Sequence, residues 1–477
     1  MSLAPACRPR LARFARLRTD PLTGTALLLY PERALKLNAT AACIIESCNG
    51  ELGVGEIAER VARAFPDAPA ERVPAAVLRV LGDLSRRGLL LDADALRSAR
   101  EPADPLPALD DAPLATAPGR PYTLIAELTY ACPLRCAYCS NPEDFASYPA
   151  RLTTDDWRRV FAEAAELGVV QLHLTGGEPA LRNDLTELAR CARDHALYVN
   201  LVTSGVTLTR DRVQALGDAG LSHVQLSFQD VDAVAAQRVA GRSYLDHKLA
   251  VAAWVKEAAL ALTVNVVLQR TNIERIPAFV ALAEHLCADR LELAHVQYLG
   301  WALRNRAALL PSADQIEAAR ISVRSERARL AGRLEIVHVM PDYYSGRPRA
   351  CMDGWAKNYV VVAPDGSVRP CHAAQHLGLE TWNVSERSLR EIWSHSPVFN
   401  AYRGDAWMLP PCRNCPEREL DHAGCRCQAH ALTRDARRAD PACALAPDHG
   451  LIQAFRLHRS EGRTEFQLRA AGGSVQS

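Results

Sequence analysis

Six apolar runs of strand length, separated by segments with helical periodicity, constrain the fold of this 477-residue chain more than any other feature. Helix-period segments such as TTDDWRRVFAEAAELG lie between the runs, which cover residues 123–128, 169–174, 198–203, 222–228, 262–268 and 290–296. This alternation predicts an α/β fold with a parallel sheet and helical crossovers, either an open sheet or a partial barrel. In such folds the active site lies beyond the carboxyl ends of the strands.

The N-terminal part has a different pattern, which predicts a small α+β module. Two strand-like runs, TALLLY and RALKL, flank Pro31-Glu32, and Asn38 is placed to cap a helix over ATAACIIESC that ends at Gly50. Two amphipathic helices follow, around EIAERVARAF and ERVPAAVLRVLGDLSRRG. This order resembles a winged helix. Residues 93–119, rich in Pro, Ala and Asp without apolar periodicity, are predicted to be a linker.

Composition restricts the function classes. The formal charge of +1, from 56 basic and 55 acidic residues, gives no global attraction to nucleic acid or anionic lipid. The basic N-terminus lacks a secretory apolar run, and no window approaches the ~18 apolar residues of a membrane span. We therefore expect a cytoplasmic protein. In that reducing compartment the fifteen cysteines indicate metal binding or catalysis rather than disulfides, and the isolated ones are expected to be inert, namely Cys7, Cys43, Cys48, Cys191 and Cys287.

Three cysteines follow the first predicted strand with the spacing Cys132-x3-Cys136-x2-Cys139. This spacing suits one face of an iron–sulfur cubane, and a set of three thiolates leaves one iron open for a chelating substrate. Zinc is the alternative, although zinc triads usually borrow a nearby histidine and favour paired C-x2-C spacing. Gly176-Gly177-Glu178 follows the second predicted strand and Ser204 follows the third, so all these segments are expected at one edge of the sheet.

These segments resemble the radical S-adenosylmethionine (SAM) superfamily. The resemblance implies a [4Fe-4S] cluster that is held by Cys132, Cys136 and Cys139 and chelated by SAM, with Tyr138 against the cluster. It implies that Glu178 and the backbone of 176–178 receive the methionine amino group. Candidates for contacts with the SAM carboxylate or ribose are Ser204, Ser227 and Asn265.

The C-terminal cysteines resemble the SPASM extension of that superfamily, which carries auxiliary clusters. The resemblance assigns one cluster, [4Fe-4S] or [2Fe-2S], to Cys351, Cys371, Cys425 and Cys427, and a second [4Fe-4S] cluster to Cys412, Cys415, Asp421 and Cys443. The division of Cys425 and Cys427 between the clusters stays open. Asp421 stands where the general pattern has cysteine. It is expected to be a ligand that shifts the potential and labilises its iron, the alternative being a surface residue beside a three-ligand cluster.

Residues 121–447 resemble the coenzyme PQQ synthesis protein E family of peptide cyclases, through stretches such as ELTYACPLRCAYCSNP, LELAHVQYLGWALRNRAAL and GCRC. The resemblance implies a carbon–carbon cross-link between glutamate and tyrosine side chains of the PqqA precursor peptide, the first step of pyrroloquinoline quinone (PQQ) biosynthesis. It also implies a flavodoxin-like electron donor. LLLYPERALKLNATAA resembles the PqqD peptide chaperones, which implies precursor binding by strand addition. A DNA-binding winged helix should show a basic recognition helix, whereas the last helix also carries acids.

The expected domains are a PqqD-like module over 1–92, the linker, a radical SAM core shaped as a partial (β/α)6 TIM-like barrel over 120–340, a SPASM domain over 341–447 and a tail over 448–477 without an assigned role. Two alternatives stay open: another SPASM peptide maturase, forming thioethers or maturing sulfatases, and a zinc-binding winged-helix regulator. Further residues could line the cavity, although core packing explains most of them equally well, namely Tyr298, Trp301, Tyr343, Tyr344 and His372.

Overall fold

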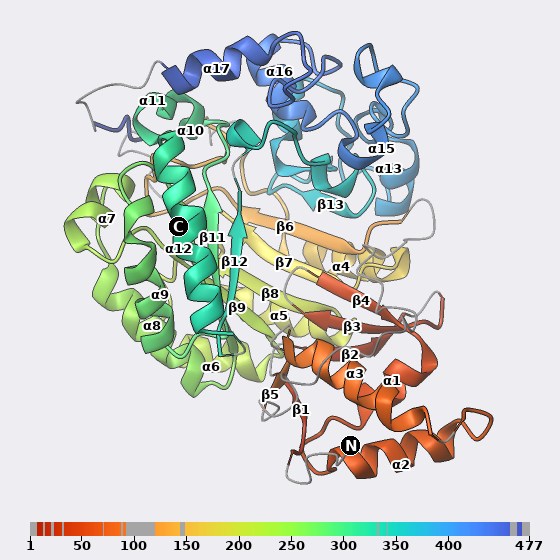
Figure 1. The fold of residues 1–477 in the computed structure, drawn as a ribbon. Coiled ribbons are helices and arrows are strands. Elements are labelled where there is room, and N and C mark those ends of the chain that lie inside the picture. The colour runs from red at the N-terminus through yellow and green to blue at the C-terminus, as the bar shows by residue number, and fades with distance from the viewer. Residues whose placement is uncertain are drawn as a thin grey trace. The chain divides into compact units, whose positions relative to one another are not determined.

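A computed structural model describes residues 7–91, 120–457 and 465–469, apart from residues 13–14, 21–22, 31–32, 70, 87–88, 144–147, 332 and 341. The chain divides into two compact units, residues 1–115 with 327–335 and residues 116–326 with 336–477 (Figure 1). The predicted linker over 93–119 lies outside the described residues. Within those ranges no helix combines the length and the hydropathy needed to cross a membrane.

The N-terminal unit contains a three-stranded antiparallel sheet and three helices. The sheet is formed by β2 (Arg16–Thr19), β3 (Ala26–Tyr30) and β4 (Arg33–Leu37), in that order. The helices are α1 (Ala39–Glu46), α2 (Val54–Ala64) and α3 (Val73–Arg86). Asn38 Oδ1 accepts from the amide of Ala41 (2.8 Å), which confirms the predicted cap. The short strand β2 and the pair β1 (Arg10–Leu11) and β5 (Leu90–Leu91) were not predicted, because these segments are too short to show periodicity.

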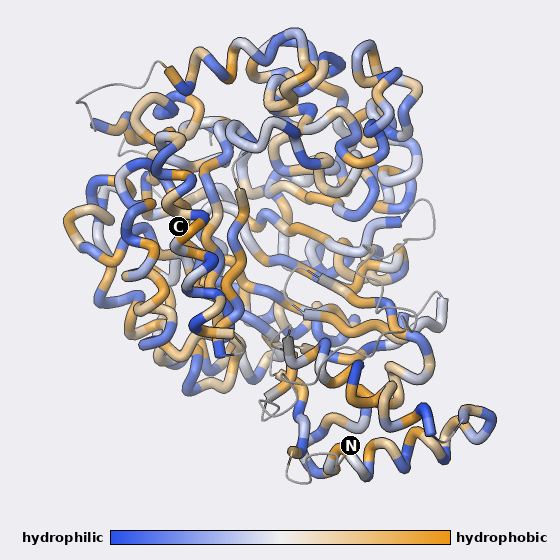
Figure 2. The backbone as a smooth tube through the Cα atoms, viewed as in Figure 1, coloured by the Kyte–Doolittle hydropathy of each residue, from blue (hydrophilic) through white to orange (hydrophobic). Residues whose placement is uncertain are grey.

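The second unit is built on a nine-stranded sheet with the order β12-β11-β10-β9-β8-β7-β6-β13-β14. The six predicted strands are confirmed, and neighbours among them are parallel. Their bounds are β6 (Thr123–Thr129), β7 (Gln171–Gly176), β8 (Tyr198–Thr203), β9 (His223–Phe228), β10 (Ala261–Leu268) and β11 (Arg290–His295). Figure 2 shows hydrophobic residues along these strands. This pattern is expected for a sheet that is covered on both faces.

Helices connect the parallel strands and pack against them: α5 contacts β8, α8 contacts β9 and β10, and α9 contacts β11 (Figure 1). The crossover helices are α4 (Thr154–Leu167), α5 (Leu185–Asp194), α6 (Arg210–Asp218), α7 (Ala233–Ala240), α8 (Leu245–Glu257) and α9 (Ile276–His285). Helix α4 begins at a capping box formed by Thr153 and Asp156 and ends at Gly168, whose φ is +98°. Three more helices follow β11, namely α10 (Trp301–Arg304), α11 (Arg306–Leu309) and α12 (Ala313–Arg329).

The cysteine-rich C-terminal part extends the same sheet. Strand β13 (Tyr359–Val362) pairs in parallel with β6, and β14 (Val368–Arg369) pairs antiparallel with β13, whereas β12 (Glu335–Val339) lies beside β11. The sheet therefore continues across residue 340, where the sequence suggests a domain boundary. The remaining helices are short, namely α13 (Leu389–His395), α14 (Pro397–Asn400), α15 (Arg418–Asp421), α16 (Arg426–Thr433) and α17 (His449–Leu457).

Candidate active site

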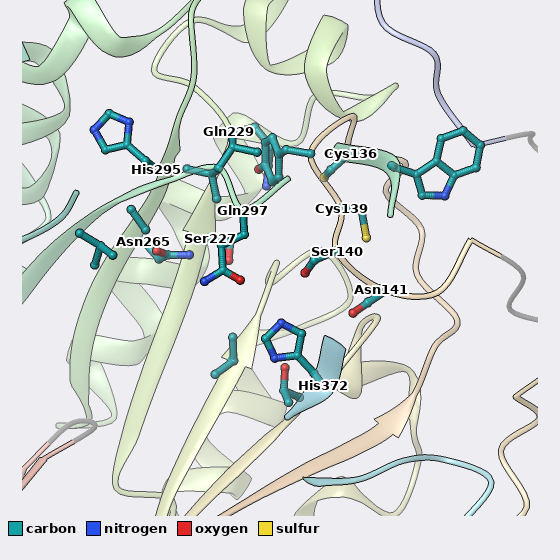
Figure 3. A pocket seen from close by; sticks show the side chains of 18 of the residues that line it. Cys136, Cys139, Ser140, Asn141, Ser227, Gln229, Asn265, His295, Gln297 and His372 are labelled. Carbon is teal, nitrogen blue, oxygen red and sulfur yellow. The ribbon is translucent and has the colours of Figure 1, made fainter. Parts of the chain in front are cut away.

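A cavity of about 520 Å³ lies at the carboxyl ends of the parallel strands and is lined by the thiols of Cys132, Cys136 and Cys139. Figure 3 shows Cys136 and Cys139 on the loop after β6, with Ser227 and Asn265 on the strands. The other residues that the sequence places at a SAM site also line this cavity, except Glu178; they are Tyr138, Gly176, Gly177, Ser204, Ser227 and Asn265. The strand ends therefore bring the predicted residues together as the parallel topology requires.

The cysteine loop is fixed by backbone hydrogen bonds to the end of α7. The amides of Arg135 and Ala137 donate to the carbonyls of Ala240 (2.9 Å) and Val239 (2.8 Å). Burial, together with the neighbouring thiols, raises the pKa of Cys132 and of Cys136 to about 12. Thiolates at this site therefore need a compensating positive charge, which a metal cluster or a buried cation can provide.

Gly176 and Gly177 allow β7 to approach the start of the cysteine loop. A Cβ on Gly176, whose φ is +127°, would lie 2.2 Å from the carbonyl oxygen of Thr129. A Cβ on Gly177 would lie 2.4 Å from the carbonyl oxygens of Tyr130 and Ala131. Glycine at these two positions therefore lets backbone pack against backbone.

The carboxylate of Glu178 is fully buried and is used within the protein. Oε1 accepts from the amide of Ala180 (3.1 Å) and from Thr203 Oγ1, and Oε2 accepts from the amide of Ser204 (2.8 Å) and from Ser204 Oγ. Glu178 does not line the cavity, whereas Ser204 does. Glu178, the side chain expected to meet the methionine amino group, therefore fixes Ser204, which itself lines the cavity.

Ser227, Asn265 and Glu292 form a polar row across three strands. Asn265 lies directly opposite Ser227 on β9 and opposite Glu292 on β11, and all three line the cavity. Gln225 Nε2 donates to Glu292 Oε2 (3.4 Å). The row thus offers hydroxyl, amide and carboxylate groups to a polar ligand. Glu292 was not predicted, because a single acid in an apolar strand gives no motif.

Lys248 of α8 is a buried cation that the sequence analysis missed. Its Nζ donates to the carbonyl of Ser227 (2.8 Å) and to Gln229 Oε1. Burial lowers its pKa to about 8, and the nearby Cys136 opposes this shift. Tyr138 forms side-chain hydrogen bonds with Gln229 and with Cys136. Gln229 therefore connects the lysine to the cysteine loop. The only sequence signal was a lysine directly before the apolar segment LAVAAWV.

His295 and His338 form a pair of histidines that was not predicted. Their Nε2 atoms lie 3.1 Å apart, and His295 lines the cavity. Burial, together with the charge of His338, lowers the pKa of His295 to about 3. His295 is therefore a neutral imidazole at physiological pH.

The aromatic candidates have both of the roles considered for them. The rings of Tyr298 and Tyr343 pack in a tilted arrangement, with centroids 4.9 Å apart, within an apolar cluster that includes Leu309 and Ile452. Both rings also line the cavity, as do Trp301 and His372. Tyr344 instead packs against the cluster and donates to the carbonyl of Pro311. The wall of the cavity is thus continuous with the core.

The four thiols assigned to the first auxiliary cluster lie in contact. Cys425 accepts hydrogen bonds from Cys351 and Cys427, which lowers its pKa and raises theirs, and Cys427 also contacts Cys371. Cys425 and Cys427 therefore belong to one group. The buried carboxylate of Asp440 supports them by accepting from the amide of Cys425 (2.8 Å).

The second group is also brought together. Burial raises the pKa of Cys412, and the negative charges of its neighbours Asp421, Cys443 and Cys415 raise it as well. Asp421 is only 8% exposed, which excludes the surface alternative, and its Oδ1 accepts from the amide of Ala423 (2.9 Å). Three thiols and a carboxylate are a donor set that iron accepts. Across the described ranges, no three His, Cys, Asp or Glu side chains are placed to hold a single metal ion.

Arg426, between Cys425 and Cys427, is a buried guanidinium without a predicted role. It is 1% exposed, and its Nη1 donates to the carbonyls of Ala436 (2.7 Å) and Arg438 (2.8 Å). Its charge lowers the pKa of both Cys412 and Cys425. Arg426 therefore places positive charge near both auxiliary groups.

Comparison with known proteins gives matches in each part of the chain. Residues 126–283 match the Radical SAM superfamily, residues 25–90 match Coenzyme PQQ synthesis protein D (PqqD), and residues 351–416 match an Iron-sulfur cluster-binding domain. The PqqA peptide cyclase of Methylocella silvestris is 53% identical over 350 residues, which cover 73% of this chain and 94% of the relative. That of Streptomyces rochei is 51% identical over 345 residues, covering 72% and 95%.

Solved structures of other proteins share this architecture. Streptococcus suis SuiB bound to S-adenosylmethionine superposes with a TM-score of 0.60 at 16% identity, covering 91% of this chain and all of SuiB. SuiB bound to its precursor peptide SuiA gives 0.59 at 15% identity, covering 92% of this chain and all of SuiB. At this identity the similarity concerns the fold alone. Together with the family matches it confirms the predicted barrel with a C-terminal cluster domain.

Proposed function

Because this chain belongs to the PqqA peptide cyclase family, we propose that it is a radical SAM enzyme that joins a glutamate and a tyrosine side chain of a PqqA-type precursor peptide by a carbon–carbon bond. This would be the first step of PQQ biosynthesis. The observation that carries the proposal is the meeting of the three thiols of the Cys132–Cys139 loop with the strand-end residues in one cavity. The family also implies SAM and iron–sulfur clusters as cofactors.

The residues at the cavity fit the proposed cofactor. Cys132, Cys136 and Cys139 would hold a [4Fe-4S] cluster, and the polar row with Ser204 would hold SAM. The SAM-bound cluster would supply a 5'-deoxyadenosyl radical, which would remove a hydrogen atom from the peptide. The protein's own part is to orient the peptide and to exclude other hydrogen donors. Glu178 contributes by fixing Ser204, and Lys248 by fixing Gln229 beside Tyr138.

The cross-link removes two hydrogen atoms from the peptide, so an electron and a proton must leave after the first hydrogen atom is taken. We assign the electron to the two auxiliary groups, the first held by Cys351, Cys371, Cys425 and Cys427, and the second by Cys412, Cys415, Asp421 and Cys443. The first would carry a [4Fe-4S] or [2Fe-2S] cluster and the second a [4Fe-4S] cluster. A flavodoxin-like protein in the cytoplasm is the proposed electron donor.

The PqqD-like unit is proposed to bind the precursor peptide. Its sheet has β2 and β4 as outer strands, and a peptide can add to such an edge through backbone hydrogen bonds. Side-chain pockets beside the edge would then give specificity. Nucleic acid and membranes are not proposed as partners.

Mass spectrometry of a PqqA-type peptide, after anaerobic incubation with SAM and a reductant, tests the proposal. The expected product has lost two hydrogens, and fragmentation should place the new bond between the glutamate and the tyrosine. Peptides with Glu→Gln or Tyr→Phe at those positions serve as matched controls and should stay unmodified. A thioether product would instead support the alternative maturase class. An unmodified wild-type peptide, despite SAM cleavage, would contradict the cyclase assignment.

A further inference from the structure

We infer that Arg469 is a positioning residue of the Cys132–Cys139 loop and that residues 465–469, near the end of the chain, complete the SAM-cluster site. The inference rests on the proposed function, because it assigns a role toward the cluster that this loop would hold. It gives the C-terminal tail a function for which the sequence offered no motif.

Arg469 contacts the cysteine loop through its side chain and its backbone. Its Nη2 donates to the carbonyl oxygens of Cys132 (3.0 Å) and Leu134 (2.8 Å). Its own carbonyl accepts from Arg135 Nη1 (3.3 Å). The side chain lines the cavity together with the three thiols. One residue of the tail thus connects both sides of the first turn of the loop.

A second attachment fixes the tail at Asn305, which is 4% exposed. The amide of Gln467 donates to Asn305 Oδ1 (2.7 Å), and Asn305 Nδ2 donates to the carbonyl of Gln467 (2.9 Å). The same Nδ2 donates to the carbonyl of Ala137 (3.0 Å), which lies between Cys136 and Cys139. Phe466 packs against the apolar cluster of Tyr298 and Tyr343. The tail is therefore held to both halves of the cysteine loop.

The charge of Arg469 also suits this place. Its side chain places this charge on the cysteine loop, at the carbonyl oxygens of Cys132 and Leu134. A cluster with three thiolate ligands is anionic, and each added electron makes it more so. A nearby cation stabilises the reduced form, so its removal should make the reduction potential more negative.

The test compares full-length protein with Arg469→Lys, Arg469→Gln and two truncations, one that ends at Leu468 and a matched one that ends at Arg469. Each protein is reconstituted anaerobically, and the SAM-dependent cluster signal is followed by electron paramagnetic resonance during a redox titration. A Cys132/Cys136/Cys139→Ala protein gives the auxiliary signals alone. Thermal unfolding checks that each variant folds.

We expect Arg469→Gln and the truncation at Leu468 to lower the potential of the SAM-dependent signal or to lose that signal, while the auxiliary signals persist. Arg469→Lys should lie between Arg469→Gln and the wild type, because it retains the charge without the forked donors. The truncation at Arg469 should match the wild type. A wild-type potential and spectrum for Arg469→Gln would overturn the inference. Absence of any SAM-dependent signal in the wild type would overturn the proposed function, and the inference with it.

Discussion

Replacement of Glu178 by glutamine should weaken both the core and SAM binding. The two oxygens of the carboxylate accept from four donors, of which the amides of Ala180 and Ser204 cannot rotate away. A glutamine has one acceptor oxygen, so in either orientation its NH2 group faces one of these amides. Hydroxyl groups can turn to accept, whereas the backbone amide is left buried without a partner.

The magnitude follows from this count of donors. Leaving a buried donor unsatisfied costs about 1–3 kcal/mol, and hydrogen bonds to a charged group contribute about 1.5–3 kcal/mol each. We therefore expect Glu178→Gln to lower the free energy of unfolding of the core by about 2–4 kcal/mol, and the affinity for SAM to fall because Ser204 is released. Glu187→Gln is the matched control, because Glu187 is half exposed on α5 and its ion pair with Arg158 contributes at most about 1 kcal/mol.

Urea denaturation followed by circular dichroism measures the stability of each variant. SAM binding is measured on the same reconstituted protein. Ser204→Ala adds a second comparison, because it removes one hydroxyl donor while the carboxylate keeps its amide partners. The reasoning predicts a large loss of stability for Glu178→Gln, a smaller one for Ser204→Ala and almost none for Glu187→Gln. If Glu178→Gln were as stable as Glu187→Gln and still bound SAM poorly, the carboxylate would contact the ligand directly, and the indirect role argued above would be wrong.

Three further predictions concern the cofactors and the N-terminal unit. Cys136→Ala should abolish SAM cleavage, measured as 5'-deoxyadenosine, while the auxiliary iron remains; undiminished production would refute the cluster assignment. Asp421→Ala should change the spectrum or iron content of one auxiliary cluster only, since the other group lies on four cysteines, and an unchanged spectrum would show that the carboxylate is not a ligand. Deletion of residues 1–92 should weaken binding of the precursor peptide, measured by titration, but preserve SAM cleavage without peptide; unaltered affinity would contradict the chaperone role.

The features that could be predicted from sequence are those encoded locally. The strand β10, for example, can be recognised as a mostly apolar run, and the spacing of Cys132, Cys136 and Cys139 places three thiols on one loop. The grouping of Cys425 with Cys427 required the fold, because two cysteines separated by one residue are equally compatible with one cluster or two. The pairing of β13 with β6 was not predictable either, because it joins residues more than 200 positions apart and the sequence of neither strand identifies its partner.

The cations beside the cysteines show the same limit and suggest a shared design. Lys248 donates to the carbonyl of Ser227, Arg469 to those of Cys132 and Leu134, and Arg426 to those of Ala436 and Arg438. A carbonyl oxygen satisfies the donor without cancelling its charge, so these hydrogen bonds hold positive charge near thiols whose deprotonation burial opposes. Lys248 and Arg469 lie outside the cysteine motifs, and Arg426 is part of one only because it separates Cys425 from Cys427. Cysteine spacing therefore predicts where iron would bind, whereas the positive charge near the thiols comes from the tertiary fold.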